Sequence, residues 1–314
     1  MNILLSTDNN YTMPTGVLMH SIGVNNSVSV CYHILVDELF TNDNKEKLER
    51  VAQKYEHSVS FYVIPKDYVS YLPLDSKTAH VTLATYYRLF ITKVLPKSIN
   101  KIIYLDSDII VRKSILDLWN TDLEEKAIGV VHDMDELRHI HPKRLPYPIE
   151  YGYFNAGVLL INLSYWRKHN CLEKFMDFAN DNYEIIKLHD QDILNSVFYD
   201  KKEWISLTYN FQSGFIYHSS YRLNIPDISS EIEAFKHDPT IIHYAAKIKP
   251  WMIECYSPYC NEWRHYWRMS EWKDVRLAGD SYKNIKQYFR MFALRHNLYM
   301  PKCEYQEIKV KRKS

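Results

Sequence analysis

The stretch "KIIYLDSDIIV", residues 101 to 111, places two carboxylates, Asp106 and Asp108, between two apolar runs. The apolar runs predict buried strand on both sides of a short polar break. Two carboxylates ~6 Å apart repel each other by about 3 kcal/mol at an effective dielectric constant of about 20. A divalent cation is the simplest compensation for this repulsion, and a solvated acidic turn is the alternative.

The segments around this stretch alternate between strand-like and helix-like patterns. We predict strands at residues 2–7, 27–36, 57–64, 101–105, 153–163 and 239–245, and helices at residues 12–26, 41–55, 82–95, 171–186 and 189–199. This order is typical of an α/β domain with a mainly parallel sheet. Ligands of such sheets collect at the carboxyl ends of the strands, where Asp8, Asn10, Asp106 and Asp108 are expected.

Two further segments set the predicted organisation of the chain. Residues 133–152 contain three prolines and no clear period, which is typical of a functional lid or a mobile loop. After residue 255 the sequence becomes rich in aromatic residues. We therefore predict a main domain at 1–255 and an aromatic and basic helical C-terminal region at 256–314.

The composition argues against several classes of protein. Of the 314 residues, 46% are hydrophobic, yet no run approaches the ~18 consecutive apolar residues of a membrane span. The first residues, "MNILLSTDNN", lack the pattern of a secretory signal, so we expect a cytoplasmic location. Only seven glycines occur, without a glycine-rich phosphate loop, and the five cysteines contain no C-x-x-C pair for zinc or redox chemistry.

The charge of the chain is asymmetric. Residues 281–314 carry nine Lys and Arg against two Glu, a net charge of +7, whereas the whole chain has a net charge of +1. Basic tails of this kind contact anionic lipid or nucleic acid. Because residues 281–299 have the pattern of an amphipathic helix, we expect peripheral contact with the inner face of an anionic membrane and no nucleic-acid partner. A helix packed on the main domain is the alternative.

Four motifs, "YLDSDIIV", "YFNAGVLLINL", "HDQDILN" and "HYAAKIKPW", occur in this order and together resemble glycosyltransferase family 8. The resemblance is to its bacterial, retaining sugar transferases, in particular the lipooligosaccharide galactosyltransferases, and extends from "STDNNY" to Trp251. It implies a GT-A, Rossmann-like nucleotide-sugar-binding fold for residues 1–255, with a mostly parallel mixed sheet and a C-terminal helical appendage.

The resemblance also implies a metal and donor site. Asp106, Asp108 and His243 would hold Mn²⁺, with Mg²⁺ as a substitute, because hard cations prefer carboxylate oxygens and accept one imidazole. The donor-binding residues implied are Ser6, Asp8, Asn10, Arg88, Asp106, Ser107, Asn155, Ala156, Asp190, Gln191, Ala246 and Lys249. At Ala246 the chain departs from the family, which usually has glycine there, and the alanine narrows the allowed backbone angles.

Acceptor and mechanism follow from the same resemblance. His80 and Asp133 match positions that line the acceptor site. The family presents a glutamine, matched by Gln191, on the face where a covalent mechanism would need a carboxylate. We therefore favour front-face substitution in which Gln191 stabilises positive charge, and Asp190 is the alternative nucleophile.

The implied reaction moves a hexose, galactose first and glucose second, from a UDP-sugar donor to a saccharide acceptor. The acceptor would be an oligosaccharide, a glycolipid or a glycoprotein of the cell surface. Two alternatives stay open at this point. One is a phosphatase resembling the haloacid dehalogenases, which share an acid pair at a strand end, and the other is a non-catalytic protein that binds sugar nucleotides.

Overall fold

The computed structural model describes residues 1–73, 83–134, 144–217, 226–255, 257–278 and 293. Ten strands in this part of the chain form two sheets. They are β1 (Asn2–Ser6), β2 (Cys31–Val36), β3 (Ser58–Val63), β4 (Lys101–Leu105), β5 (Ile109–Val111), β6 (Ile128–His132), β7 (Phe154–Asn162), β8 (Lys202–Trp204), β9 (Phe211–Gln212) and β10 (Ile241–His243).

Helices connect most of these strands. The α-helices are α1 (Thr12–Asn25), α2 (Asn42–Gln53), α3 (Ile91–Val94), α4 (Leu116–Asn120), α5 (Leu163–Lys168), α6 (Cys171–Asp181), α7 (His189–Phe198), α8 (Gly214–Tyr217), α9 (Pro226–Phe235) and α10 (Cys260–Met269). The 3-10 helices are η1 (Lys66–Tyr68), η2 (Leu83–Phe90), η5 (Ile149–Tyr151), η6 (Tyr183–Ile185) and η7 (Leu207–Asn210). Thr41 caps α2, since its hydroxyl accepts a hydrogen bond from the Asn44 N–H.

The larger sheet confirms the predicted α/β class. Its seven strands follow the order β3-β2-β1-β4-β7-β6-β8. Strand β7 runs antiparallel to both of its neighbours, and the other pairs are parallel. The sheet is therefore mixed but mostly parallel, and the carboxyl ends of β1 and β4 lie side by side, where an α/β sheet collects its ligands.

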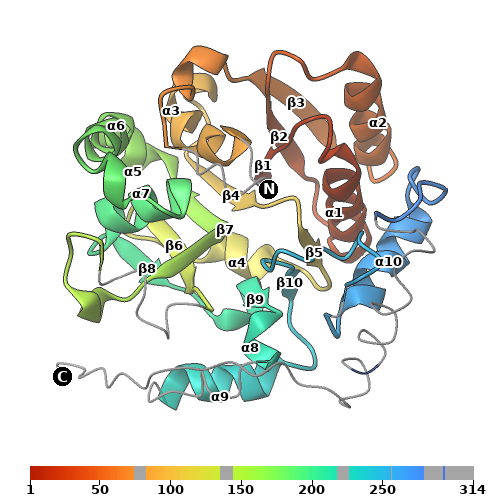
Figure 1. The fold of residues 1–314 in the computed structure, drawn as a ribbon. Coiled ribbons are helices and arrows are strands. Elements are labelled where there is room, and N and C mark those ends of the chain that lie inside the picture. Colours follow the sequence, from red (N-terminus) through yellow and green to blue (C-terminus); the bar gives the residue numbers. More distant parts are fainter. Residues whose placement is uncertain (74–82, 135–143, 218–225, 256, 279–292, 294–314) are drawn as a thin grey trace.

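Helices cover both faces of this sheet (Figure 1). Because side chains alternate along a strand, Ile3 and Leu5 of β1 join the core cluster that includes buried residues of α1 and α2. Leu4, between them, joins the opposite cluster, to which Trp166 of α5 and Phe175 of α6 belong. Strand β1 is thus apolar on both faces, as its continuous hydrophobic run predicts.

A second, three-stranded sheet has the order β5-β10-β9. After β4 the chain turns through residues 106–108 and continues as β5 in this second sheet. Strand β10 pairs antiparallel with β5, in a register that places His243 opposite Ile109. This pairing brings a histidine from late in the chain to the two acids of the turn.

One predicted helix differs in kind from the prediction. Residues 82–95 were expected to form a single helix, but the described part is the 3-10 helix η2 followed by the short helix α3. In a 3-10 helix the residues at positions i and i+3 lie on the same side. Thr85 and Arg88 of η2 therefore point the same way, and both contact Asp190 of α7.

The region after residue 255 packs on the main domain where it is described. Helix α10 packs against α1, and the Trp272 ring lies so close to Gly16 that a Cβ atom there would be 2.1 Å from it. Arg50 of α2 forms an ion pair with Glu271, with its Nε 3.0 Å from Oε1. The domain boundary at 255 stays a prediction, and the predicted helix at 281–299 lies outside the described residues except for residue 293.

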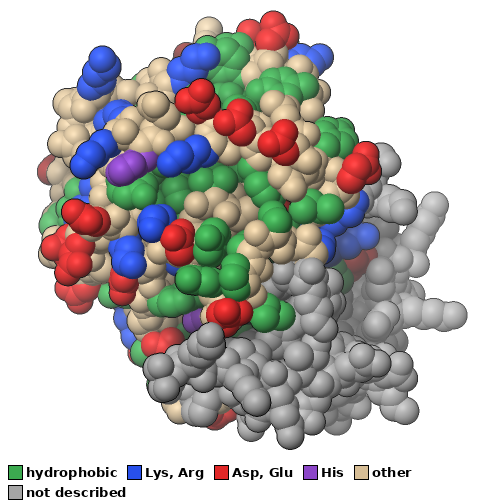
Figure 2. Space-filling model, turned by 90° about the vertical axis from the view of Figure 1, so that its left-hand side faces the viewer, with side chains coloured by type: hydrophobic (Ala, Val, Ile, Leu, Met, Phe, Trp, Pro, Cys, Tyr) green, Lys and Arg blue, Asp and Glu red, His purple; other side chains and the backbone are tan. Residues whose placement is uncertain are grey.

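No helix in the described part of the chain is long and apolar enough to cross a membrane. Figure 2 shows the face of the molecule that carries α5, α6, α7 and β8. Acidic and basic side chains are interspersed there with hydrophobic ones.

Candidate active site

A cavity of about 270 Å³ opens at the carboxyl ends of β1 and β4. It is lined by Ser6, Thr7, Asp8, Tyr11, Ala84, Thr85, Arg88, Tyr104, Asp106, Ser107, Asp108, Asn155, Gln191, His243, Ala245 and Lys249. The wall thus combines acidic, basic and amide side chains from both sheets and from η2 and α7. Such a polar wall suits a ligand that carries both negative charge and hydroxyl groups.

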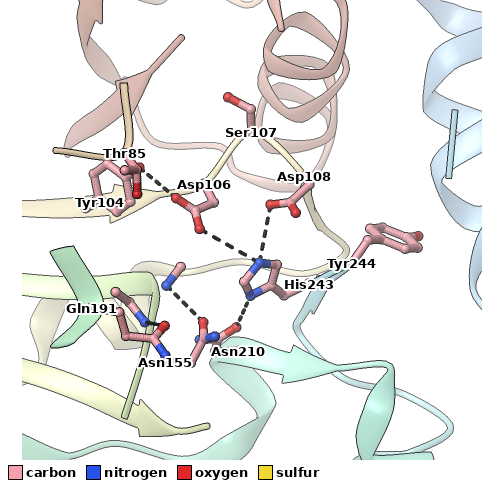
Figure 3. Close-up of polar contacts among 12 residues, drawn as sticks. Thr85, Tyr104, Asp106, Ser107, Asp108, Asn155, Gln191, Asn210, His243 and Tyr244 are labelled. Atoms are coloured by element: carbon pink, nitrogen blue, oxygen red, sulfur yellow. Dashed lines mark hydrogen bonds and ion pairs between the residues drawn. The ribbon is translucent and has the colours of Figure 1, made fainter. Parts of the chain in front are cut away.

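Three of the lining residues form a candidate metal centre (Figure 3). His243 Nε2 lies 3.3 Å from Asp108 Oδ1 and 3.9 Å from Asp106 Oδ2. One potential ligand atom from each of the three residues lies within 4.8 Å of the other two. Adjacent ligands of an octahedral ion at about 2.1 Å would be about 3 Å apart, so the three side chains can share one divalent cation.

Asp106 is held in place by hydrogen bonds to one of its two carboxylate oxygens. Its Oδ1 accepts hydrogen bonds from Arg88 Nη2 at 2.8 Å and from the Tyr104 hydroxyl at 2.7 Å. The guanidinium of Arg88 also lies 3.9 Å from the centre of the Tyr104 ring, a cation–π contact. These contacts occupy Oδ1 and leave Oδ2 directed toward His243.

Asp108 is paired with a buried lysine. Its Oδ2 accepts a hydrogen bond from Lys249 Nζ at 2.6 Å, and Lys249 also donates to the Tyr244 carbonyl. Burial by itself would raise the pKa of the Asp108 carboxyl, but the charges of Lys249 and His243 outweigh burial and hold this pKa well below its usual range. Asp108 is therefore an ionised carboxylate, as a metal ligand must be.

A chain of amide side chains lies behind His243. Its Nδ1 is 2.9 Å from Asn210 Oδ1, and Asn210 Nδ2 donates to Asn155 Oδ1 at 2.9 Å. Asn155 Nδ2 in turn donates to Asp133 Oδ2 at 2.9 Å. Gln191 Nε2 donates to the same carboxylate oxygen at 3.2 Å. The candidate metal centre is thus joined to Gln191 through buried hydrogen bonds.

Gln191 and Asp190 begin α7 but face different surroundings. Gln191 lines the cavity, and its Oε1 accepts the Ala156 N–H at 2.9 Å. Asp190 is held by the Thr85 hydroxyl and by Arg88 Nε, 3.0 Å from Oδ2. Burial raises the pKa of Asp190 despite the charge of Arg88. The residue before them, His189, has a φ of 53°, a left-handed conformation that is costly outside glycine and recurs at functional sites.

The turn after β1 supplies a third part of the wall. Asp8 Oδ1 accepts the N–H groups of Asn10 and Tyr11, at 2.9 and 3.0 Å. Burial, with the charges of Asp108, Asp8 and Asp106, raises the pKa of Tyr11 to about 12. The Tyr11 hydroxyl therefore stays protonated, and its ring packs edge-on against Trp251 at 5.7 Å between centroids.

The structure brings most of the predicted residues to one cavity. All three predicted metal ligands line it, together with the predicted donor-site residues Ser6, Asp8, Arg88, Ser107, Asn155, Gln191 and Lys249. The predicted residues that do not line it are Asn10, Ala156, Asp190, Ala246 and Asp133. Ala246 has no positive φ, so alanine in place of the family's usual glycine causes no backbone strain. His80 lies outside the described residues.

Sequence reasoning missed several residues at this site. Thr7, Tyr11, Ala84, Thr85, Tyr104 and Ala245 line the cavity, and Asn210 contacts His243 from behind. Tyr104 could have been found, because it precedes Asp106 by two residues and side chains at i and i+2 share a face of a strand. Asn210 had no local signal, since it is 33 residues from His243.

The comparisons with known proteins agree with this architecture. A sequence model of the family described as "Glycosyl transferase family 8" matches residues 2–255. General stress protein A of Bacillus subtilis (strain 168) is 27% identical over 282 residues, which cover 88% of this chain and 96% of that protein. A lipopolysaccharide 1,2-glucosyltransferase of Escherichia coli is 29% identical over 307 residues, which cover 96% of this chain and 86% of that protein.

A solved structure supports the fold separately. The crystal structure of the galactosyltransferase LgtC in complex with donor and acceptor sugar analogues matches with a TM-score of 0.79 at 23% identity, over 87% of this chain and 99% of that one. The fold is therefore the GT-A fold predicted from the sequence.

The α/β fold and the acid-rich cavity agree with those of a glycosyltransferase. Since the family model covers most of the chain, the chain belongs to glycosyl transferase family 8. Membership of this family explains the pair Asp106 and Asp108, so the phosphatase alternative is not needed to explain it.

Proposed function

We propose that this chain is a retaining glycosyltransferase that moves a hexose from a UDP-sugar to a saccharide acceptor and depends on a divalent cation. The observation that carries the proposal is the convergence of Asp106, Asp108 and His243 on the wall of one cavity. Asp106 and Asp108 come from the turn between β4 and β5, and His243 comes from β10 of the second sheet. One oxygen of each carboxylate is directed toward His243 Nε2, which gives the three ligand atoms that one divalent cation could share.

These residues fit Mn²⁺, with Mg²⁺ as a substitute, because two carboxylates and one imidazole are a set that hard to borderline cations accept. When bound, the ion would act as a Lewis acid on the departing diphosphate. Arg88 and Lys249, both buried at the cavity wall, carry the positive charges of the chain itself that would bind phosphate oxygens. Asp8, Asn10, Ser6 and Ser107 would hold the nucleoside.

Asn155, Ala156, Asp190 and Gln191 would surround the donor sugar. We favour front-face substitution, in which the acceptor oxygen bonds to the anomeric carbon as the bond to the β-phosphate oxygen breaks, and the acceptor proton passes to that phosphate. The engagement of Asp190 by Thr85 and Arg88 supports this choice over a covalent intermediate on Asp190. Gln191 Oε1 accepts one hydrogen bond and keeps a second lone pair for developing positive charge.

Galactose is the proposed donor sugar and glucose the second choice. The names of the relatives favour a hexose, since one is a lipopolysaccharide glucosyltransferase and LgtC is a galactosyltransferase. We propose a glycolipid, oligosaccharide or glycoprotein acceptor that contacts His80 and Asp133. We also propose that residues 1–255 form the catalytic domain and that residues 256–314 contact the inner face of an anionic membrane.

Calorimetric titration with UDP tests the metal-dependent donor site. We expect wild-type protein with Mn²⁺ to bind UDP at least about 100-fold more tightly than with EDTA. The Asp108→Asn variant with Mn²⁺ should bind like the EDTA sample. The exposed residue Asp43 offers a control, and Asp43→Asn should bind like wild type. UDP binding that is indifferent to metal and to Asp108 would overturn the proposal.

A further inference from the structure

The amide chain behind His243 is buried along its whole length. Asn210 is fully buried, and His243, Asn155 and Asp133 are each less than a tenth exposed. Buried amides are held by hydrogen bonds in which every donor meets an acceptor. The direction of each bond in this chain can therefore be derived from the Asn155 end, where one neighbour can only donate and the other can only accept.

The orientation of Asn155 is set by two neighbours. The Gly157 N–H, which can only donate, lies 2.9 Å from one side-chain atom of Asn155. The Asp133 carboxylate, which can only accept when ionised, lies 2.9 Å from the other. The atom near Gly157 is therefore Oδ1, and the atom near Asp133 is Nδ2.

The orientation of Asn210 and the tautomer of His243 follow. Asn155 Oδ1 accepts, so the Asn210 atom 2.9 Å from it is the donor Nδ2. Asn210 Oδ1 is then the atom 2.9 Å from His243 Nδ1, and that nitrogen must carry a proton. The other ring nitrogen, Nε2, is left as the atom that faces Asp106 and Asp108.

We propose that Asn210 is a positioning residue that keeps the His243 proton on Nδ1 and presents Nε2 to the divalent cation. The inference rests on the metal role proposed above and adds a residue to it. Asp133 is the anchor of the chain, since it accepts from both Asn155 and Gln191. Outer contacts of this kind typically change metal affinity by about 10- to 100-fold.

The His243 ring packs against Gly157 of β7, the strand that also carries Asn155. A Cβ atom on Gly157 would lie 2.2 Å from His243 Cε1 and 2.7 Å from its Nδ1. The ring therefore packs directly on the backbone of β7. Close packing on one side and a directional hydrogen bond on the other leave His243 a single orientation.

Binding of Mn²⁺ alone, followed by electron paramagnetic resonance, tests this inference on folded protein. Asn210→Leu removes the acceptor from Nδ1, and we expect about 10- to 100-fold weaker Mn²⁺ binding. Asn210→Asp keeps an acceptor toward Nδ1 and loses the donor toward Asn155, and we expect Mn²⁺ affinity within about threefold of wild type. Thermal unfolding of each variant confirms that it is folded.

The tautomer itself is measured by ¹⁵N NMR of histidine-labelled protein without metal, with His243→Gln for assignment. We expect a protonated Nδ1 in wild type and in Asn210→Asp. A wild-type ring protonated on Nε2 alone would overturn the inference, and so would an Asn210→Asp variant that loses Mn²⁺ affinity tenfold or more. If Asn210→Leu does not fold, the Asn210→Asp results decide.

Failure of the proposed function is distinguishable from failure of this inference. Wild-type protein that does not bind Mn²⁺, or that binds it equally well as Asp108→Asn, would remove the metal role itself. Wild-type binding that needs Asp108 but does not change in folded Asn210→Leu would retain the metal role and overturn the part assigned to Asn210.

Discussion

The fold brings two pairs of acids near each other, and in each pair one residue separates the two acids. The two pairs have different partners. Asp106 and Asp108 follow β4, and each has one oxygen directed toward His243 at the cavity. Asp190 and Asp192 begin α7 and are engaged by protein donors. The difference shows that the spacing D-x-D does not define a role, since the neighbours decide which oxygens stay available.

Asp192 is the clearest example of an acid used for structure. Its Oδ1 accepts from Arg144 Nη2 at 2.6 Å and from the Tyr153 hydroxyl at 2.7 Å. Its Oδ2 accepts the backbone N–H groups of Lys187 and Leu188, both at 2.7 Å. Four donors surround a fully buried carboxylate, which fixes the turn before α7 and leaves no oxygen for a ligand.

The largest predicted effect concerns Asp192→Asn. An amide places an NH₂ group against two of the four donors in either orientation. Because the substitution breaks a buried charged network, we expect the free energy of unfolding to fall by about 3 kcal/mol. Urea denaturation measures this change, with Asp177→Asn on the exposed side of α6 as the control.

The same substitution at Asp108 should weaken metal binding strongly and reduce stability less than Asp192→Asn does. An asparagine there can still accept from Lys249 with its oxygen, but it removes a charge that Lys249 and His243 stabilise, so we expect the free energy of unfolding to fall by about 1 to 2 kcal/mol, less than for Asp192→Asn. A metal ligand is nevertheless lost. If Asp108→Asn were as destabilised as Asp192→Asn, the distinction between the two acid pairs would not hold.

The fold could be predicted because its signals are local. Five strands of the large sheet, β1, β2, β3, β4 and β7, were predicted from their own sequence patterns, and the acids of residues 106–108 follow β4 directly. Strands β6 and β8 of this sheet were not predicted, and β8 (KEW) has no apolar run. His243 was also expected at the metal site, on the resemblance of "HYAAKIKPW" to the family. The pairing of β10 with β5 then places it there.

Other features depend on contacts that no local pattern encodes. The 3-10 geometry of η2 lets Thr85 and Arg88 both contact Asp190, which lies about a hundred residues later in the chain. Similarly, Asn210 has its role only because the Gly157 N–H orients Asn155. Lys249 was predicted as a phosphate contact, and its ion pair with Asp108 could not be read from its position in the sequence.

A smaller effect is predicted for Gly157→Ala. This substitution changes only the packing around His243 and leaves both acids of the cavity in place. The added methyl group would lie 2.2 Å from His243 Cε1 and 2.9 Å from Asn155 Oδ1, so the ring must move. We expect Mn²⁺ affinity to fall about tenfold, as for loss of an outer contact. Mn²⁺ titration of the folded variant measures this.

Gly129 of β6 provides the matched control for that substitution. A Cβ atom there would meet the Leu123 side chain at 3.2 Å and Leu160 Cβ at 3.3 Å, with no metal ligand among its three nearest neighbours. Gly129→Ala should therefore leave Mn²⁺ affinity unchanged, even if it lowers stability slightly. Equal affinities for the two variants would show that the position of the His243 ring does not limit metal binding.

The last prediction extends the comparison to His20, a buried group that has no charged partner in contact with it. His20 of α1 bonds through Nδ1 to the Tyr55 hydroxyl at 3.0 Å, and its Nε2 has no hydrogen-bond partner among the described residues. Burial, with a contribution from the charge of Lys54, lowers the pKa of His20 from 6.5 to about 4, although Glu271 opposes this. Folded His20 is therefore neutral at pH values where the unfolded chain binds a proton.

Stability from this group is fully present above pH 6.5 and is lost as the pH falls toward 4, because protons bind the unfolded state first. We expect the midpoint of thermal unfolding to fall by a few degrees more in wild type than in His20→Gln between these pH values. Glutamine does not titrate and can still bond to Tyr55. If the unfolding midpoints of the two proteins fell in parallel with pH, His20 would bind a proton equally well in the folded and unfolded states. Burial without a charged partner would then not oppose its protonation.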